Sequence, residues 1–518
     1  MKRNILFILL ILGILGIIDA GYLTFEHYNN ILPPCTINHF LPILTDCGKV
    51  LTSSYSLIFG IPLALLGIIH YSFVALSLIL AIRFKNKLYS IWTLMQSVLG
   101  AIASLYFMYL QLFVIKSICT YCTVSAFISF AIFILAFFYL EKERKTLFIY
   151  KLGILYRFIL KPIFFLINPE IVHVVMVGFG SLLGNCPCMK KILPFFFNIT
   201  HKSLEQKIAG IQFKNPVGLA AGFDYHANLT QILPLINFGF GSVGTITNLS
   251  YEGNPPPLLG RLPKSKSLMV NKGYKNLGAV KTIEKLEKLQ FRYPVGISIG
   301  RTNSKKQISQ KQSVEDVVQT FKKFESSKVL NEYYELNISC PNLFGNISFY
   351  PPKNLNELLT AVSKLTITKP VFIKMPIEKT NKEFLEILNV ISKFSFVTGI
   401  IVGNLQKNRK DLSFDPSEII KFKVGNFSGK PCEKRSNELI ELAYRSYKKR
   451  FVIIGCGGVF SAKDAYEKIK KGATLVQLIT GMIFQGPQLV AQINLELIEL
   501  LKKDNYKNIK DAIGSINI

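Results

Sequence analysis

The nine cysteines of this 518-residue chain fall into two groups whose surroundings predict different redox chemistry. Cys35, Cys47, Cys119 and Cys122 lie in or beside a strongly apolar N-terminal region. Cys340 lies instead within the sequence NISCPN, in a remainder with the composition of a soluble protein. The last two cysteines of the first group form a C-x-x-C pair, a spacing that allows two thiols to close a small disulfide. The chain is therefore expected to carry two redox centres.

The C-x-x-C pair, CTYC, begins an apolar stretch, and this position favours a reactive dithiol. A thiol at the start of a helix has a lowered pKa, so Cys119 is expected to be the more acidic of the two. Cys35 and Cys47 follow the first apolar stretch, where they could pass a disulfide between a soluble partner and CTYC by thiol–disulfide exchange. Structural disulfides that pin this loop and a four-cysteine zinc site are the alternatives. We predict no metal site, because 71 residues, most of them apolar, separate the two pairs.

Four apolar stretches near the N-terminus predict a four-helix transmembrane bundle. They cover approximately residues 5–24, 57–82, 89–115 and 120–140, and each is close to the ~20 residues that cross a bilayer. Lys and Arg residues precede the first stretch, separate the second from the third, and follow the fourth. Because such positively charged segments stay in the cytoplasm, we expect both chain ends on the cytoplasmic side of the cell membrane. The four N-terminal cysteines are then expected on the opposite, oxidising side.

Residues 1–142 resemble the vitamin K epoxide reductase family, in its bacterial disulfide-forming branch. The resemblance rests on CGKVLTSSYSLIFGIPLALLG, which begins at Cys47, and on CTYCTVSAFIS. It implies that Cys119 and Cys122 are an active-site dithiol beside a bound quinone, and that Cys35 and Cys47 are the shuttle pair of the loop. Many bacterial members carry a fused thioredoxin-like domain, which we do not find in this sequence. The implied partner is a separate thioredoxin-like thiol protein on the extracytoplasmic side.

Residues 143–204 are expected to form a linker and a membrane-associated helical hairpin. An apolar, aromatic segment follows the charged sequence EKERK, and Pro162 and Pro169 divide it into two short helices. This pattern is typical of a hairpin that lies on the membrane, although two ordinary packing helices would show the same stripe. Cys186 and Cys188 have no second pair nearby on the reducing side, so we expect no redox role for them.

Residues 205–505 alternate between short apolar runs and helical stretches, and they predict a (β/α)8 TIM barrel. The eight runs are NPVGLAAGF, FGFGSVGTIT, YPVGISIG, YYELNISC, PVFIKMP, TGIIVGN, FVIIGCGG and TLVQLITG. Continuous apolar runs of this length are typical of buried parallel strands. Polar residues and glycines end the runs, where the active sites of such barrels are built. These positions are Asp224, Thr245, Ser298, Asn337 with Cys340, Lys374, Asn404, Gly457 with Gly458, and Thr480 with Gly481.

The last two runs carry a pattern that favours phosphate binding. Gly457 and Gly458 allow backbone amides to approach an anion, and Ser461 is placed to cap the following helix so that its N-terminus points at the ligand. Gly481, after the eighth run, would complete the cradle. A plain turn is the alternative, since turns also need glycine.

The barrel resembles dihydroorotate dehydrogenase, an FMN enzyme of pyrimidine biosynthesis, over about 360 residues that include the hairpin. The matching motifs are NPVGLAAGFD, NISCPN, IKMP, GNFSGKP and IIGCGGVFSAKDAYEKIKKGATLVQLITGMIFQGP. The hairpin and the last motif resemble class 2, the quinone-reducing enzymes. Cys340, however, stands where class 2 usually has Ser and class 1 has Cys. The resemblance implies FMN as cofactor and either class of electron acceptor.

The resemblance also implies roles for individual residues. Cys340 would be the base that takes a proton from C5 of dihydroorotate while a hydride leaves C6 for FMN. Lys374 would lie beside the N1 and O2 region of the flavin. Four asparagines, whose carboxamides suit the alternating carbonyl and N–H edge of a pyrimidine, would hold the substrate: Asn271, Asn337, Asn342 and Asn404. The other implied flavin and phosphate contacts are Ala220, Ala221, Gly222, Thr245, Ser298, Gly429, Gly457, Gly458, Thr480 and Gly481.

Three positions depart from the family pattern. Tyr225 stands where the family has Lys, Ser298 where an Asn is usual, and Leu405 where a Thr follows the asparagine of the sixth strand. The loop NKGYKN is also one residue shorter than the usual substrate loop. Loss of a lysine near FMN would remove a charge-assisted hydrogen bond and weaken flavin binding or shift its potential. An altered substrate is therefore conceivable.

These features predict a bifunctional membrane oxidoreductase. We expect the barrel to oxidise (S)-dihydroorotate to orotate with FMN and quinone, and the bundle to oxidise thiols to disulfides with quinone. In an alternative, the barrel is a decayed or repurposed FMN module that anchors or regulates the thiol oxidase. A tRNA dihydrouridine synthase is less favoured, because Ser339 replaces the glycine expected before the active cysteine. The formal charge of +29 comes from lysines spread along the chain, so we expect no nucleic-acid partner.

Overall fold

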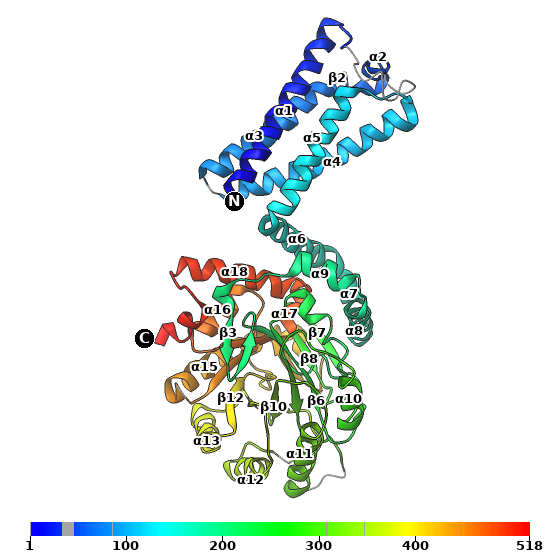
Figure 1. The fold of residues 1–518 in the computed structure, drawn as a ribbon. Helices are drawn as coiled ribbons and strands as arrows, with labels where there is room; N and C mark the ends of the chain where they lie inside the picture. Colours follow the sequence, from blue (N-terminus) through cyan, green and yellow to red (C-terminus); the bar gives the residue numbers. More distant parts are fainter. Residues whose placement is uncertain are drawn as a thin grey trace. The chain divides into compact units, whose positions relative to one another are not determined.

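The computed structural model describes residues 2–33, 46–84, 86–305, 309–345, 348–448 and 450–517. The chain forms two compact units, Met1–Phe148 and Ile149–Ile518, which are described separately (Figure 1). Cys35, predicted as one half of the shuttle pair, lies outside the described residues.

The first unit contains the four apolar helices that the sequence predicted. Each is long and apolar enough to cross a membrane. Helix α1 packs against α3 and α5, and α4 packs against the same two helices. Leu9, Val74, Leu78 and Ile132 meet in the interior. The bounds are α1 Lys2–Asn29, α2 Cys47–Leu51, β1 Leu57–Ile58, β2 Ile61–Pro62, α3 Leu63–Phe84, α4 Lys87–Tyr109 and α5 Thr120–Tyr139, with a π-helical turn at Leu110–Ile115.

Four α-helices and a π-helical turn precede the barrel, where the sequence predicted two short helices. Pro162 does not interrupt the chain, because it lies in the first turn of a helix that follows a π-helical turn. The helical structure is interrupted before Pro169 and again after Asn185, and the two helices on either side of the second interruption make an angle of 105°. The bounds are α6 Glu141–Leu155, the π-helical turn Tyr156–Leu160, α7 Lys161–Leu166, α8 Pro169–Asn185 and α9 Met189–Phe197.

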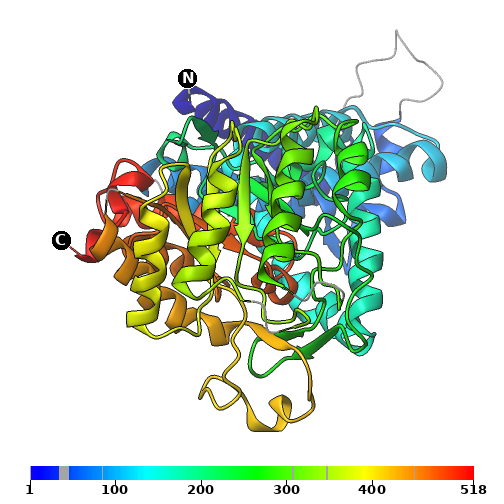
Figure 2. The same cartoon turned by 90° about the horizontal axis from the view of Figure 1, so that it is seen from below.

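Eight parallel strands close a barrel in the order β10-β11-β12-β14-β15-β5-β6-β9. Each predicted apolar run forms one of these strands, which confirms the (β/α)8 fold, and helices surround the strands (Figures 1 and 2). The strands are β5 Val217–Leu219, β6 Phe240–Ile246, β9 Val295–Ile299, β10 Tyr333–Asn337, β11 Val371–Met375, β12 Val397–Val402, β14 Val452–Cys456 and β15 Leu475–Leu478. The helices are α10 Ala279–Leu286, α11 Gln310–Glu325, α12 Pro352–Ser363, α13 Asn381–Ser392, α14 Pro416–Ile419, α15 Glu433–Tyr447, α16 Ala462–Lys470, α17 Thr480–Gln485 and α18 Leu489–Lys503.

Two additional sheets lie at opposite ends of the barrel. The hairpin β3 (Gln206–Ile208) and β4 (Ile211–Phe213) buries its apolar face against the first residues of several strands, including Phe240 and Tyr333. It therefore closes the N-terminal end of the barrel. At the other end, β7 (Leu259–Leu262), β8 (Ser267–Val270) and β13 (Asn426–Gly429) form an antiparallel sheet from the loops that follow β6 and β12. This second sheet, which Figure 2 shows beside the yellow-orange segment around α14, flanks the catalytic end.

Candidate active sites

The predicted polar residues form a hydrogen-bonded layer at the C-terminal end of the barrel. Asn337 ends β10 and lies opposite Lys374 of β11 in the strand register. Its side-chain nitrogen donates to Thr245 Oγ1 at 2.9 Å, and Thr245 Oγ1 lies 3.0 Å from Ser298 Oγ. All four residues are buried. The structure therefore brings together predicted residues from β6, β9, β10 and β11.

Ser339 links two of the predicted substrate asparagines. Its hydroxyl donates to Asn337 Oδ1 at 3.0 Å and accepts a hydrogen bond from Asn404 Nδ2 at 2.5 Å. The backbone N–H of Ser339 also donates to Asn337 Oδ1, at 3.2 Å. Our sequence analysis gave Ser339 no role. An Asn followed two residues later by Ser is typical of a turn, and this pattern could have indicated the link between Asn337 and Ser339.

Asn254 links the other two predicted asparagines. Its side-chain nitrogen donates to Asn271 Oδ1 at 3.1 Å and to the backbone oxygen of Asn342 at 2.9 Å. Asn426 Nδ2 donates to Asn342 Oδ1 at 2.6 Å, and Asn303 Nδ2 donates to Asn254 Oδ1 at 3.1 Å. Sequence reasoning missed Asn254, Asn303 and Asn426. Each lies in a loop or short edge strand, without the apolar periodicity that marks an element.

Cys340 lies three residues after β10, next to these asparagines in the chain. Burial raises the pKa of its thiol to about 11, whereas a backbone hydrogen bond involving Asn342 and the charges of Arg301 and Lys374 act in the opposite direction. The hydroxyl of Tyr274, which interacts electrostatically with Cys340, donates to the backbone oxygen of Asn337 at 3.0 Å. Burial therefore outweighs the nearby cations, and a reaction that needs the thiolate of Cys340 should become faster as pH rises.

Glycines let backbone atoms line the mouth of the barrel beside β14 and β15. Gly457 and Gly458 have φ of 104° and 74°, which favours glycine at both positions. A Cβ at Gly457 would meet Cys432 Cβ at 2.9 Å, and one at Gly481 would collide with the backbone oxygen of Val459. Neither backbone could carry a side chain without moving its neighbours. The hydroxyl of Thr480, at the start of α17, lies 2.8 Å from that of Ser428 in β13.

The predicted cap of α16 is present, but it does not leave the helix end free. Ser461 Oγ accepts from the backbone N–H of Asp464 at 3.3 Å. The carboxylate of Asp464 in turn accepts from the backbone N–H of Phe460 at 2.9 Å and from Ser461 Oγ at 3.0 Å. A carboxylate therefore lies in the first turn of α16, and the expectation that this helix end points at an anion stays a prediction.

The loop after β5 and the start of β13 supply the remaining predicted cofactor residues. Ala220 N–H donates to the backbone oxygen of Leu478 at 3.3 Å, and Ala221 is buried. Gly222 has φ of 113° and no atom within 4 Å of the position that a Cβ would take, so it borders open space. Gly429 has φ of 90°, and a Cβ there would collide with the backbone oxygen of Lys266. The mouth of the barrel is therefore open beside Gly222 and closely packed at Gly429.

The cysteines of the first unit form a second candidate site. Cys119 is the N-cap of α5, and its sulfur accepts from the backbone N–H of Cys122 at 3.5 Å. Both thiols are free, whereas Cys47, at the start of α2, is disulfide-bonded. Cys47, Val50 and Cys119 share one buried cluster, with Cys122 packed against it. The hydrogen bond with Cys122 lowers the pKa of Cys119, and Asp19 of α1 opposes this effect.

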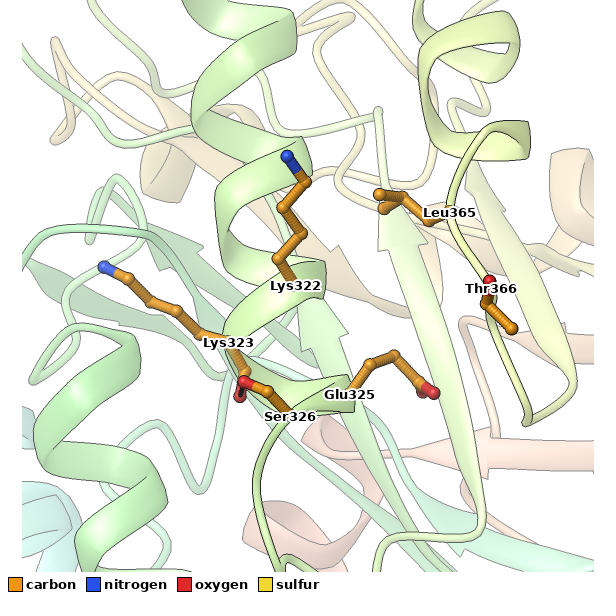
Figure 3. A pocket seen from close by; sticks show the side chains of 6 residues that line it. All are labelled: Lys322, Lys323, Glu325, Ser326, Leu365 and Thr366. Carbon is orange, nitrogen blue, oxygen red and sulfur yellow. Dashed lines mark hydrogen bonds between the residues drawn. The ribbon is translucent and has the colours of Figure 1, made fainter.

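A surface hollow between α11 and the segment after α12 lies outside the candidate site of the barrel. Figure 3 shows Lys322, Lys323 and Glu325 of α11 on one side, and Leu365 and Thr366 on the other. The segment after α12 leads into the start of β11. The hollow therefore lies toward the N-terminal end of the strands, whereas barrel active sites lie at the C-terminal end.

Comparison with known proteins agrees with this geometry. The family model described as dihydroorotate dehydrogenase matches residues 203–501. A dihydroorotate dehydrogenase (quinone) from Sulfurovum sp. is 34% identical over 359 residues, which cover 68% of this chain and 97% of that relative. The chain belongs to the dihydroorotate dehydrogenase family. A second model, described as the vitamin K epoxide reductase family, matches residues 7–137, the part of the chain that contains the four apolar helices.

Further relatives cover the same part of the chain. A dihydroorotate dehydrogenase (quinone) from Helicobacter acinonychis is 32% identical over 358 residues, 68% of this chain and 97% of that protein. A crystal structure of the Eimeria tenella dihydroorotate dehydrogenase in complex with ferulenol is 26% identical, with a TM-score of 0.59, and covers 68% of this chain and 96% of that chain. The bundle is thus an addition to a barrel and hairpin of ordinary length for the dihydroorotate dehydrogenase family.

Tyr225, one of the positions that depart from the family pattern, contacts aromatic and basic side chains. The ring of His173, on α8, stacks on that of Tyr225 with centroids 5.4 Å apart. Lys272 Nζ lies 4.2 Å from the centre of the same ring. Burial lowers the pKa of Lys272 to about 7 and that of His173 to about 3. Tyr225 stands where the resemblance implies a lysine, and the amino group of Lys272 lies over its ring.

Proposed function

We propose that the chain is a quinone-reducing dihydroorotate dehydrogenase joined to a quinone-dependent thiol oxidase. One observation supports the first activity most directly: four asparagines, Cys340 and Lys374 converge on the mouth of one barrel. A pyrimidine presents alternating carbonyl and N–H groups, and each carboxamide can both donate and accept. Substrate specificity is then assigned to Asn271, Asn337, Asn342 and Asn404.

The residues present fit FMN. Gly222 borders open space, and Gly457, Gly481 and Thr480 lie beside the C-terminal ends of β14 and β15, where they would hold the phosphate of the cofactor. Lys374 is a buried cation on the strand between the substrate asparagines, where it would stabilise negative charge. When bound, FMN would accept the hydride from C6 of dihydroorotate.

Cys340 is proposed to remove the proton from C5 of the substrate. Its sulfur must be ionised to do so, and the raised pKa means that the thiol form dominates at neutral pH. Asn342, two residues further on, is held by Val270 O and Asn426, which fixes the loop that carries the sulfur. The asparagines orient the ring so that C5 faces this sulfur, and general base catalysis of this kind contributes roughly 10²- to 10⁴-fold.

The hairpin is proposed to lie on the cytoplasmic face of the cell membrane and to admit quinone. Helix α8 packs on the barrel through Val177, and Gly184 lies directly against the backbone of Ile232. Its other face is apolar and exposed, with Leu182 at 68%, and Leu166 of α7 is 88% exposed. Such a surface on a protein with transmembrane helices suits contact with acyl chains.

The membrane bundle is proposed to oxidise thiols on the extracytoplasmic side. Cys35 would take electrons from a separate thioredoxin-like protein, Cys47 would exchange with Cys119, and Cys122 would lie against the quinone. The shared burial of Cys47 and Cys119 supports the middle step, because exchange requires an attacking thiolate next to a disulfide. The lowered pKa of Cys119 suits it as the sulfur that Cys47 attacks and that later leaves the mixed disulfide, because a thiol of low pKa leaves readily.

Spectroscopy of the purified full-length chain tests the barrel activity. We expect a flavin spectrum that dihydroorotate bleaches without added quinone, with orotate as the product, and reoxidation by a short-chain quinone. A chain that holds no flavin, or whose flavin dihydroorotate does not bleach, would favour the alternative in which the barrel is a decayed module.

A further inference from the structure

The bundle carries a carboxylic acid inside a transmembrane helix, and no step described so far uses it. Asp19 lies in the span Ile5–Asn29 of α1, ten residues or ~15 Å from its cysteine-side end. An acid at such a depth is costly, and intramembrane acids commonly belong to proton or ion pathways. Helix α1 packs against α3 and α5, so the surroundings of Asp19 come from those two helices.

A row of hydroxyl groups connects Asp19 to the interior of the bundle. Ser125 of α5 hydrogen-bonds to the carboxylate of Asp19. The hydroxyl of Tyr71, on α3, lies 3.0 Å from Ser125 Oγ and 2.8 Å from Ser129 Oγ. Asp19 Oδ2 is buried and has no hydrogen-bond partner among the described residues. The acid therefore has one oxygen available for a further proton donor.

The same row lies next to the dithiol. Cys122, Ser125 and Ser129 are three and four residues apart on α5, so they share one face of that helix. Asp19 interacts electrostatically with both Cys119 and Cys122. Among the described residues of α3, α5 and the turn before α5, these thiols and Tyr71 are titratable groups that interact electrostatically with the acid.

A glycine fixes this arrangement on α1. A Cβ at Gly16, one turn before Asp19, would meet Tyr71 Cδ1 at 2.5 Å. The absence of a side chain at Gly16 thus lets the ring of Tyr71 lie against α1, with its hydroxyl directed to Ser125 and Ser129. Helices α1, α3 and α5 each supply one part: the acid, the phenol and the dithiol.

We propose that Asp19 carries protons between the CTYC dithiol and the quinone. When the Cys119–Cys122 disulfide forms, two thiols lose two protons and two electrons, and the quinone gains two of each to become a hydroquinone. Asp19 accepts a proton from one thiol and gives it to a quinone oxygen, so the carboxyl group ends each cycle in its starting state. The inference rests on the proposed thiol oxidase function and adds the route that its protons take.

The test uses the full-length chain in lipid vesicles, with dithiothreitol as thiol donor and a short-chain quinone as acceptor. We expect Asp19→Asn to slow thiol oxidation by about 10²- to 10⁴-fold, with a remaining rate that rises with pH because solvent must then take the thiol proton. Asp19→Glu should recover much of the rate. Dihydroorotate oxidation by the barrel should be unchanged in both variants.

A second measurement separates proton transfer from a structural role. Because Asp19 opposes the lowering of the Cys119 pKa, alkylation of Cys119 without quinone should move to lower pH in Asp19→Asn. The variant would then have more thiolate and yet turn over more slowly, which loss of packing does not explain. Ser77→Ala is the matched control, since it removes a buried hydrogen bond between α3 and α4, to Thr93 at 2.9 Å.

Two outcomes would overturn the inference. If Asp19→Asn keeps the parent rate and pH profile, or Ser77→Ala is equally slow, the acid carries no proton while the thiol oxidase function stands. If the parent chain itself does not oxidise dithiothreitol with quinone, the proposed function and the inference fail together.

Discussion

The sulfur of Cys340 has to be ionised before it can take a proton, and its surroundings oppose that. With a pKa of about 11, only about one chain in 10⁴ carries the thiolate at pH 7. We therefore expect the rate of flavin reduction by dihydroorotate, measured in single turnovers, to rise by about tenfold per pH unit from pH 7 to pH 10. Cys340→Ser should shift this profile to still higher pH, because a hydroxyl ionises less readily than a thiol.

Cys340→Ala should retain FMN and bind orotate, yet reduce its flavin about 10²- to 10⁴-fold more slowly. Cys188→Ala replaces an exposed thiol of the same unit and should behave as the parent. Flavin reduction at the parental rate in the alanine variant would remove Cys340 from the mechanism.

Lys272 gives a separate prediction about pH and stability. Its pKa is lowered by burial to about 7, whereas an unfolded lysine has a pKa of about 10.4. Between these values the unfolded chain binds more protons, so the destabilisation by this buried charge is complete below pH 7 and fades as pH rises to about 10. Lys272→Met should abolish this rise of a few kcal/mol, seen as the thermal midpoint of the barrel against pH. Lys281→Met, an exposed change on α10, should leave it intact.

Some site residues could be predicted from the sequence and others could not. Asn271, Asn337, Asn342 and Asn404 were identified because they follow apolar runs or match family motifs. Asn254 was missed, because its role depends on contact with Asn342, 88 residues away. The effect of burial on Cys340 could not be derived either, since it depends on how closely several loops pack around one sulfur.

At the scale of elements, continuous apolar runs were a reliable signal and short edge strands were not. The eight barrel strands are largely buried on both faces, so their sequences are mostly apolar, with a few polar residues such as Glu335 and Gln477. The strands β7 and β13 alternate between partly buried and buried residues over four positions, too short a pattern to distinguish from a loop. Moreover, β13 pairs with β8 across more than 150 residues, and nothing local in either segment indicates its partner.

The exposed face of the hairpin gives a prediction about quinone access. Changing Leu166 and Leu182 together to Glu should raise KM for a long-chain quinone supplied in vesicles, because charge on this face opposes entry into acyl chains. The bundle still anchors the chain, so the protein stays in the membrane. Single-turnover reduction of the flavin by dihydroorotate should be unchanged.

Leu412→Glu is the matched control, since Leu412 is a fully exposed leucine in the loop before α14. It should leave KM for the long-chain quinone at the parental value. The role of the hairpin would be refuted by a double variant that uses long-chain and water-soluble quinones as the parent does.

At the scale of the whole molecule, four membrane spans require that the two ends of the bundle lie on the same side. The distribution of Lys and Arg predicts that this side is the cytoplasm, together with the barrel and its proposed substrate. On that prediction the N-terminal cysteines belong to an oxidising compartment, as the proposed thiol oxidase needs. The topology therefore decides whether both proposed reactions can run in one chain.

Labelling of single introduced cysteines tests this arrangement. Asn30 follows α1 and is exposed, and Asn86 caps α4 at the opposite end of the bundle. In intact cells a membrane-impermeant maleimide should label Asn30→Cys but not Asn86→Cys, and permeabilised cells should show labelling of both. The reverse pattern would place the CTYC dithiol in the cytoplasm. That compartment keeps protein thiols reduced, so disulfides made there would be reduced again. Such a result would exclude the proposed thiol oxidase while leaving dihydroorotate oxidation by the barrel to be judged by its own spectrum.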